Sequence, residues 1–194
     1  MNFLSYLING ISLGSVYAII ALGYTMVYGI AKMLNFAHGD IIMVGSYVAF
    51  IAINSMGLPV PVSILLSVVV CTVLGMVIER VAYKPLRHAS KLAVLITAIG
   101  ASYFLQNVAL LIFGANTKSF TSIVGNGSVQ LAGGALSVTM VTIVTVIACV
   151  VIMIGLMAFM KYSKAGHAML AVSEDDGAAQ LMGINVNATI ALTF

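Results

Sequence analysis

The sequence has 194 residues, of which 62% are apolar and 7% are charged, and its formal net charge at pH 7 is +3. An ordinary water-soluble domain has about 25% charged residues, so this composition excludes the soluble classes. It predicts a helical membrane protein, because hydrocarbon accepts only backbones that satisfy their own hydrogen bonds.

Five apolar runs follow one another along the chain, and a sixth begins at its end. The five runs cover residues 3–28, 41–53, 60–78, 92–113 and 136–160. The second run corresponds to only about 20 Å of helix, whereas the hydrocarbon layer is about 30 Å thick. We therefore expect the preceding NFAHGD to lie partly at membrane depth, where polar groups face protein or a water-filled cavity. The last run, VNATIALTF, is too short to span, and we expect the sequence to be part of a longer chain or a truncated form of one.

Basic residues predict the orientation of the chain. They gather in ERVAYKPLRHASK, residues 79–91, and in the segment after the fifth run, where Lys161 and Lys164 lie. Both loops are expected to face the cytoplasm, since Lys and Arg concentrate there. The connection over 114–135 contains only Lys118 and is expected to face outward. Counting backwards, the loop after the second run and the N-terminus face outward too.

Polar residues of the 79–91 loop are expected to interact locally. Pro85 should end a helix, and Glu79 should pair with Lys84 or Arg80. Arg80, Lys84 and Arg87 are most simply anchors at the cytoplasmic headgroups.

Two further segments have local predictions. Short strand-like runs on either side of the Gly-Asn-Gly at 125–127 predict a surface hairpin. Gln106 and Asn107, inside the fourth run, are expected to form hydrogen bonds between helices, with pore lining as the alternative.

Three of the five acidic residues of the chain lie side by side after the fifth run, as Glu174, Asp175 and Asp176. Ser173 predicts an N-cap, after which carboxylates in the first turn interact favourably with the helix macrodipole. Gly183 is the expected C-terminal stop. EDDGAAQLM is therefore predicted to be a short cytoplasmic helix. A catalytic carboxylate cluster explains the acids less well, because no nucleophile, partner acid or metal-ligand spacing accompanies them.

The predicted helix displays a patch of small and apolar side chains, formed by Ala178, Ala179, Leu181 and Met182. Short helices with such a patch dock into grooves on partner proteins. From composition alone, an amphipathic helix lying on the membrane surface is an equal alternative.

Three blocks, NFAHGD, ERVAYKPLR and AVSEDDGAAQLMGI, occur in this order. Together with GISLGSVYAIIALGYTMVYGI and LITAIGASYFLQN, they resemble the first permease subunit of ABC importers for leucine, isoleucine and valine, over essentially all 194 residues. The resemblance implies an all-α, polytopic transmembrane helical bundle of the ABC importer permease type. It also implies one permease domain over 1–194, incomplete at its C-terminus, with a cytoplasmic coupling segment at 161–185.

By this resemblance, residues 174–184 form a coupling helix that sits in a cleft of a cytosolic ATPase. The implied ATPase-coupling residues are Glu174, Asp175, Asp176, Ala178, Ala179, Leu181, Met182 and Gly183. Where the fuller family motif has Glu before two alanines, this sequence has Asp176 and Gly177. The individual groove contacts therefore stay open.

The implied function is that of the membrane-spanning permease subunit of an ATP-driven importer for branched-chain amino acids, in which ATPase closure drives alternating access. We expect no enzyme activity, cofactor or metal in this chain, since it has no GxxxxGK[ST] loop and ATP is used by partner subunits. The implied partners are two cytosolic ABC ATPase subunits, a second homologous permease subunit, a periplasmic or lipid-anchored substrate-binding protein and membrane lipid, without nucleic acid. The implied location is the bacterial inner (plasma) membrane, with several spans.

Asn35, His38 and Asp40 are the candidate residues of the substrate pathway. Broken helices bring polar groups to the path of a transporter, and a zwitterionic amino acid needs polar partners for both charges. The competing role is structural, in which these residues only satisfy the helix break. A metal at His38 and Asp40 would lack a third ligand.

Two other classes of function share this composition. An ion-coupled secondary transporter or channel for small amino acids would need no ATPase-docking helix. An intramembrane enzyme that uses His38 and Asp40 would lose its activity when both are replaced by Asn.

Overall fold

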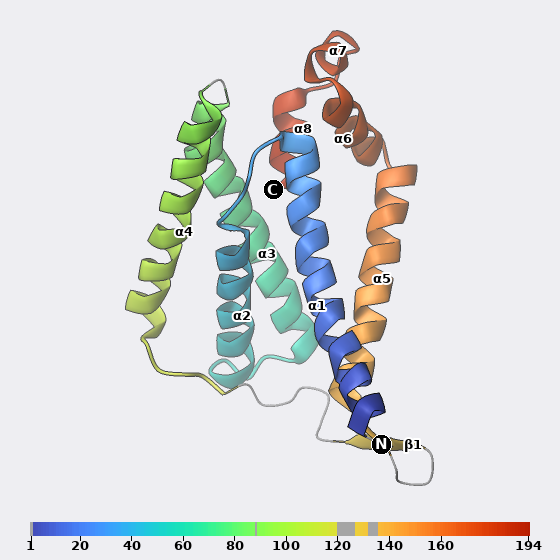
Figure 1. The fold of residues 1–194 in the computed structure, drawn as a ribbon. Coiled ribbons are helices and arrows are strands. Elements are labelled where there is room, and N and C mark those ends of the chain that lie inside the picture. Colours follow the sequence, from blue (N-terminus) through green and yellow to red (C-terminus); the bar gives the residue numbers. More distant parts are fainter. Residues whose placement is uncertain (1, 88, 120–126, 132–135) are drawn as a thin grey trace. The chain divides into compact units, whose positions relative to one another are not determined.

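The computed structural model describes residues 2–87, 89–119, 127–131 and 136–194. The described chain is helical apart from one two-stranded sheet, which confirms the all-α class (Figure 1). Contacts divide it into two units, Met1–Gly23 with Phe120–His167 and Tyr24–Ser119 with Ala168–Phe194, called unit 1 and unit 2 below. Helix α1 (Asn2–Ala31) begins in unit 1 and ends in unit 2. The expectation of a single permease domain stays a prediction.

Unit 1 contains most of α1, a short hairpin and α5 (Met140–Tyr162). Strand β1 (Ser128–Leu131) pairs antiparallel with β2 (Leu136–Thr139). The fifth apolar run was predicted to be helical from residue 136, which is wrong, because its first four residues form β2. The hairpin is also displaced from its predicted position: 128–131 is the first strand rather than the second, and residues 120–126 lie outside the described part.

Helix α6 (Lys164–Glu174) follows α5 after a sharp turn at Ser163. The Gly166 amide donates to Ser163 Oγ at 2.8 Å, and the His167 amide donates to the Ser163 carbonyl at 3.0 Å. A Cβ on Gly166 would lie 2.5 Å from the Phe159 carbonyl oxygen, so only glycine fits here without displacing backbone.

Unit 2 is built on three neighbouring helices, α2 (His38–Asn54), α3 (Val60–Ile78) and α4 (Lys91–Phe113). Helix α3 continues into a π-helical turn, η1 (Glu79–Tyr83), and a 3-10 turn, η2 (Lys84–Leu86). The helical path therefore ends just beyond Pro85, close to the predicted point. Two short helices, α7 (Asp176–Leu181) and α8 (Val186–Thr193), complete the unit.

Local sequence signals explain where these helices begin and end. Pro61 lies in the first turn of α3, where its missing N–H costs no helical hydrogen bond. The Ser90 hydroxyl caps α4 by accepting from the Ala93 amide at 3.3 Å. Gly114, with φ of 77°, ends α4 in a backbone conformation that glycine adopts most readily.

Helices α2 and α3 pack closely at Gly45. The Ser67 hydroxyl donates to the Gly45 carbonyl at 2.7 Å, and the Cys71 thiol donates to the Ile41 carbonyl at 3.5 Å. A Cβ on Gly45 would lie 2.6 Å from Cys71 Sγ and 3.1 Å from Ser67 Oγ. The hydrophobic core of the unit extends from this contact to η1 and α4. Its buried members are Ala37, Ile41, Ile78, Tyr83, Val94, Ala98 and Leu105.

Among the described residues, four helices are long and apolar enough to cross a membrane, by length and composition: Phe3–Ala31, Val60–Leu86, Lys91–Phe113 and Met140–Tyr162. Helix α2 has 17 residues. At 1.5 Å per residue it is about 25 Å long, which is less than the hydrocarbon thickness. Figure 1 shows that α2 begins partway along α3. The prediction of a second span too short to cross alone is confirmed.

Candidate functional site

The candidate coupling helix α7 begins two residues later than predicted. Asp175 is the N-cap, with extended backbone, and its Oδ1 accepts from the Ala178 amide at 2.9 Å. The predicted cap, Ser173, lies inside α6, where its hydroxyl donates to the Leu170 carbonyl at 2.6 Å. Both residues are good caps by type, and the continuation of α6 through Glu174 decides between them. Of the three acids, only Asp176 lies in a first helical turn.

The C-terminal end of α7 agrees with the sequence. Gly183 has φ of 87°, and its amide donates to the Gln180 carbonyl at 3.0 Å. The Ile184 amide donates to the Ala179 carbonyl at 3.0 Å. These two bonds form a Schellman motif, which satisfies carbonyls that the helix itself leaves unpaired. The predicted stop at Gly183 is confirmed, although α7 has six residues rather than the nine expected.

Three of the four residues of the predicted patch are exposed. Leu181 is 90% exposed and Met182 is 82% exposed, and Ala178 is exposed as well. Ala179 is only 4% exposed, so its assignment to the surface patch is wrong. On so short a helix, one face must pack inward, and Ala179 is the residue on that face. Two large apolar side chains are left at the end of α7, where a partner surface can reach them.

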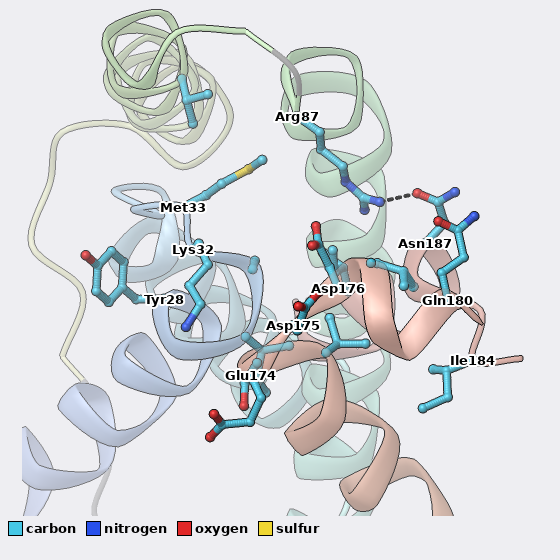
Figure 2. A pocket seen from close by; sticks show the side chains of 18 of the residues that line it. Tyr28, Lys32, Met33, Arg87, Glu174, Asp175, Asp176, Gln180, Ile184 and Asn187 are labelled. Carbon is cyan, nitrogen blue, oxygen red and sulfur yellow. Dashed lines mark hydrogen bonds between the residues drawn. The ribbon is translucent and has the colours of Figure 1, made fainter. Parts of the chain in front are cut away.

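A cavity of about 1220 Å³ lies beside α7 in unit 2. Its walls are the end of α1 with the following residues to Leu34, the segment that leads into α4, and residues 172–190 of the C-terminal region. The basic side chains of its lining are Lys32, Arg87 and Lys91, and the acidic ones are Glu174, Asp175 and Asp176. Figure 2 shows Lys32 on one wall and the three acids on the candidate coupling segment. Both signs of charge therefore meet in one water-accessible space.

Lys32 ends α1 in an unusual backbone conformation. Its φ is 54°, and it is the one non-glycine residue with positive φ in the described chain. Its amide still donates to the Tyr28 carbonyl at 2.9 Å, which closes the last turn of the helix. The left-handed region costs an L-residue roughly 1–2 kcal/mol, so the surrounding fold holds Lys32 in place.

Arg87 joins two elements that are far apart in the sequence. Its guanidinium donates to the Glu79 carboxylate of η1. It also donates to Oδ1 of Asn187 in α8, as Figure 2 shows. The Glu79 side chain is 3% exposed and that of Arg87 is 11% exposed. The predicted pairing of Glu79 with Lys84 or Arg80 is therefore wrong, as is the headgroup role of Arg87. A buried carboxylate needs a partner with it in the interior, and η2 turns the chain so that Arg87 faces Glu79.

Arg80 and Lys84 are exposed, and their role as headgroup anchors stays a prediction. No sequence pattern pointed to Asn187, whose contact with Arg87 spans 100 positions along the chain.

The NFAHGD block places three polar side chains around the start of α2. Asn35 is 2% exposed, and its Oδ1 accepts from the Tyr83 hydroxyl at 3.0 Å. Its Nδ2 is buried without a hydrogen-bond partner among the residues that the structure describes. The His38 ring meets the Tyr24 ring edge-on, with centroids 6.4 Å apart. Asp40, 7% exposed, accepts from the Ser102 hydroxyl of α4.

Asn35, His38 and Asp40 thus interact with three different elements, η1, α1 and α4. They share a location but do not converge on one point. Ser102, which holds Asp40, lies 11 residues after the first residue of α4, about 16 Å along its axis. The hydrogen bond from Ser102 therefore holds the Asp40 carboxylate well inside the apolar part of unit 2.

The amides of α4 bond within their own helix. Gln106 Nε2 donates to Ser102 Oγ at 3.1 Å, and Asn107 Nδ2 donates to the Tyr103 carbonyl at 2.7 Å. The prediction that both form bonds between helices is wrong, because an exposed amide reaches a group one turn back more easily than a neighbouring helix. Of these three polar side chains, Ser102 is the one whose described hydrogen bond reaches across to α2.

The long apolar helices and the buried helix break define a polytopic helical membrane protein. The family described as "Branched-chain amino acid transport system / permease component" matches residues 6–194. The chain therefore belongs to this family, and it is a multi-pass protein of the inner membrane.

Several curated relatives cover the whole chain. It is 44% identical to the high-affinity branched-chain amino acid transport system permease protein BraD of Pseudomonas aeruginosa and 42% identical to the corresponding protein LivH of Escherichia coli K12, in each case over 100% of this chain and 66% of the relative. A probable branched-chain amino acid transport permease protein LivH of Methanocaldococcus jannaschii is 29% identical, over 88% of this chain and 55% of the relative. The chain thus spans 66% of the length of its first relatives. No solved structure matches it.

Proposed function

We propose that this chain is the membrane-spanning permease subunit of an ATP-driven importer for branched-chain amino acids. It would work with two cytosolic ABC ATPase subunits, a second homologous permease and a periplasmic or lipid-anchored substrate-binding protein. The family and the names of the relatives support the transport role and the substrate class. The permease itself makes and breaks no covalent bond, and ATP is hydrolysed by its partners.

The observation that carries the ATPase-driven mechanism is the exposed end of α7. A short helix with a fixed cap and a fixed stop is rigid enough to transmit a push, and its 90% exposed Leu181 and 82% exposed Met182 offer apolar contact area. A helix that displays anchors of this kind fits a groove on a partner. We assign α7, which begins at Asp176, and the two acids before it, Glu174 and Asp175, to contact with the ATPase.

The candidate translocation path passes the start of α2. Asn35 supports this assignment because its buried Nδ2 is a donor without a partner in the described chain, at a helix break. Asp40 and His38 lie within five positions of it. A carboxylate or ammonium group that moves past would find both donors and acceptors there.

Substituting Met182 tests the proposal with little risk to the fold. Met182→Lys places a charge on an exposed apolar anchor, and we expect it to abolish copurification of the ATPase and to lower leucine uptake about tenfold or more. Met56, 62% exposed in the α2–α3 connection at the other end of unit 2, gives the matched control (Figure 1). Met56→Lys should leave ATPase binding unchanged. Full ATPase binding in Met182→Lys would contradict the proposal. Ala179, another implied ATPase-coupling residue, is unsuitable for this test because it is buried and a bulky residue there would disrupt α7 itself.

An ion-coupled secondary transporter or channel is the alternative. It predicts uptake that follows an ion gradient and persists when ATP is removed. The proposed importer predicts uptake that needs ATP and is indifferent to an ionophore. Uptake into proteoliposomes under both conditions separates the two.

A further inference from the structure

The π-helical turn η1 bonds to the helix break before α2 and, through Arg87, to α8, which follows the candidate coupling helix. Its first and last residues, Glu79 and Tyr83, are 2% and 1% exposed, although both carry polar groups. The Lys84 amide donates to the Glu79 carbonyl across the turn. Single π turns within helices are rare and are frequent at functional sites.

One end of η1 is bound to the C-terminal region. The Arg87 guanidinium holds the Glu79 carboxylate and Asn187 at the same time. Asn187 lies in the first turn of α8, and Asn185, the N-cap of α8, follows the Gly183 stop of α7 by two residues. A displacement of α7 is therefore passed to Asn187 through a very short and well-fixed link.

The other end of η1 is bound to the helix break. The Tyr83 hydroxyl donates to Asn35 Oδ1 at 3.0 Å, and it also lies 3.4 Å from the Leu34 carbonyl. The Tyr83 ring packs against Phe194 with centroids 5.0 Å apart, and the Phe194 carbonyl leaves no room for a Cβ on Gly75 of α3. The C-terminal end of α8 thus contacts η1 directly through Phe194, and its N-terminal end reaches Glu79 through Arg87.

We propose that η1 is the element that transmits movement of α7 to the start of α2, and that Arg87 and Asn187 are positioning residues for this step. The route runs from α7 through Asn187 and Arg87 to Glu79, and then through the π turn and Tyr83 to Asn35. Polar and directional contacts, buried at Glu79, Tyr83 and Asn35, suit this purpose because they shift together rather than slide. This inference rests on the proposed function, since it needs an ATPase that moves α7.

The test separates coupling from folding. In proteoliposomes that contain the complete transporter, ATP hydrolysis and leucine uptake are measured for Asn187→Ala and Arg87→Lys. Asn187→Ala removes the exposed end of the link and leaves Glu79 paired. Arg87→Lys keeps a positive charge beside Glu79, but one ammonium group replaces a fork that holds two partners.

We expect both variants to assemble with the ATPase and to hydrolyse ATP within about twofold of wild type, while uptake falls about fivefold or more, so that more ATP is used per leucine. Asn107→Ala is the matched control, because Asn107 is an exposed asparagine that bonds only within α4 in the described structure. The number of ATP molecules that this variant hydrolyses per leucine taken up should equal that of wild type. An unchanged ratio in both variants, or a parallel fall of hydrolysis and uptake, overturns the inference. If wild type neither binds the ATPase nor shows ATP-dependent uptake, the proposed function fails and the inference fails with it.

Discussion

At the scale of single residues, α7 depends on one side chain at its start and one backbone conformation at its end. Asp175 accepts a hydrogen bond from the Ala178 amide, and Gly183 adopts a φ of 87°. A helix of six residues has little intrinsic stability, because nucleation costs more than a few hydrogen bonds return. The two ends therefore contribute much of what keeps it folded.

Replacing Asp175 tests this dependence. Asp175→Ala leaves the Ala178 amide without its acceptor and should cost α7 about 1 kcal/mol. Hydrogen exchange of the amides over 178–182 should then accelerate about fivefold. Asp176→Ala is the control, because Asp176 does not cap the helix and its removal should change exchange much less. Equal acceleration in both variants would show that charge, rather than the cap, stabilises α7.

Single residues also show where the sequence was sufficient. Gly183 was identifiable because a left-handed C-terminal residue is nearly always glycine. The N-cap of α7 was not identifiable, because Ser173 and Asp175 are equally suitable by residue type. Neither residue type shows where α6 ends. The partner of Glu79 was missed for a related reason: Lys84 and Arg80 are nearer along the chain, whereas the π turn and η2 bring Arg87 to it.

At the scale of elements, the contact between α2 and α3 is set by small residues. Gly45, Ser67 and Cys71 allow a close approach that a larger residue would prevent. Without a hydrophobic driving force between helices in lipid, such close packing is a main source of stability.

A pair of glycine substitutions should therefore act in opposite directions. Gly45→Ala forces Cys71 Sγ and Ser67 Oγ away, and we expect it to destabilise unit 2 by about 1–3 kcal/mol. Gly100→Ala, in α4, adds a Cβ with nothing within 4 Å and should be neutral or stabilising by up to about 1 kcal/mol. Thermal unfolding in detergent measures both. A Gly45→Ala protein as stable as Gly100→Ala would contradict the importance of the contact.

The helices themselves were largely predictable from apolar runs, and Val60–Ile78 was found with its bounds correct. The start of α5 was not predictable, because Leu136–Thr139 continues the apolar run of the helix. Its β-pairing depends on a partner strand elsewhere in the sequence. Periodicity cannot distinguish a short apolar strand from the beginning of a helix.

At the scale of the whole molecule, three basic residues mark one end of unit 2. Lys32, Arg87 and Lys91 line the cavity beside α7, while the α2–α3 connection with Met56 lies at the opposite end (Figure 1). Positive charge is retained on the cytoplasmic side of membrane proteins, so α7 should face the cytosol.

Cysteine labelling checks this orientation. A membrane-impermeant maleimide should label Met56→Cys in intact spheroplasts, and it should label Met182→Cys only after the membrane is opened. Cys71 and Cys149 lie within α3 and α5, and the parent protein gives the background. The reverse pattern would place α7 outside and would remove the basis for contact with a cytosolic ATPase.

The length of α2 has a consequence for the surrounding lipid. A helix of about 25 Å cannot match an apolar layer of about 30 Å, and the difference is absorbed by a thinner bilayer or by water drawn toward the unfilled end. Here that end holds Asn35, His38 and Asp40. The acyl-chain length of the host membrane should therefore affect the hydration of the candidate translocation path. We expect transport to be slower in vesicles of long-chain lipids than in vesicles of short-chain lipids.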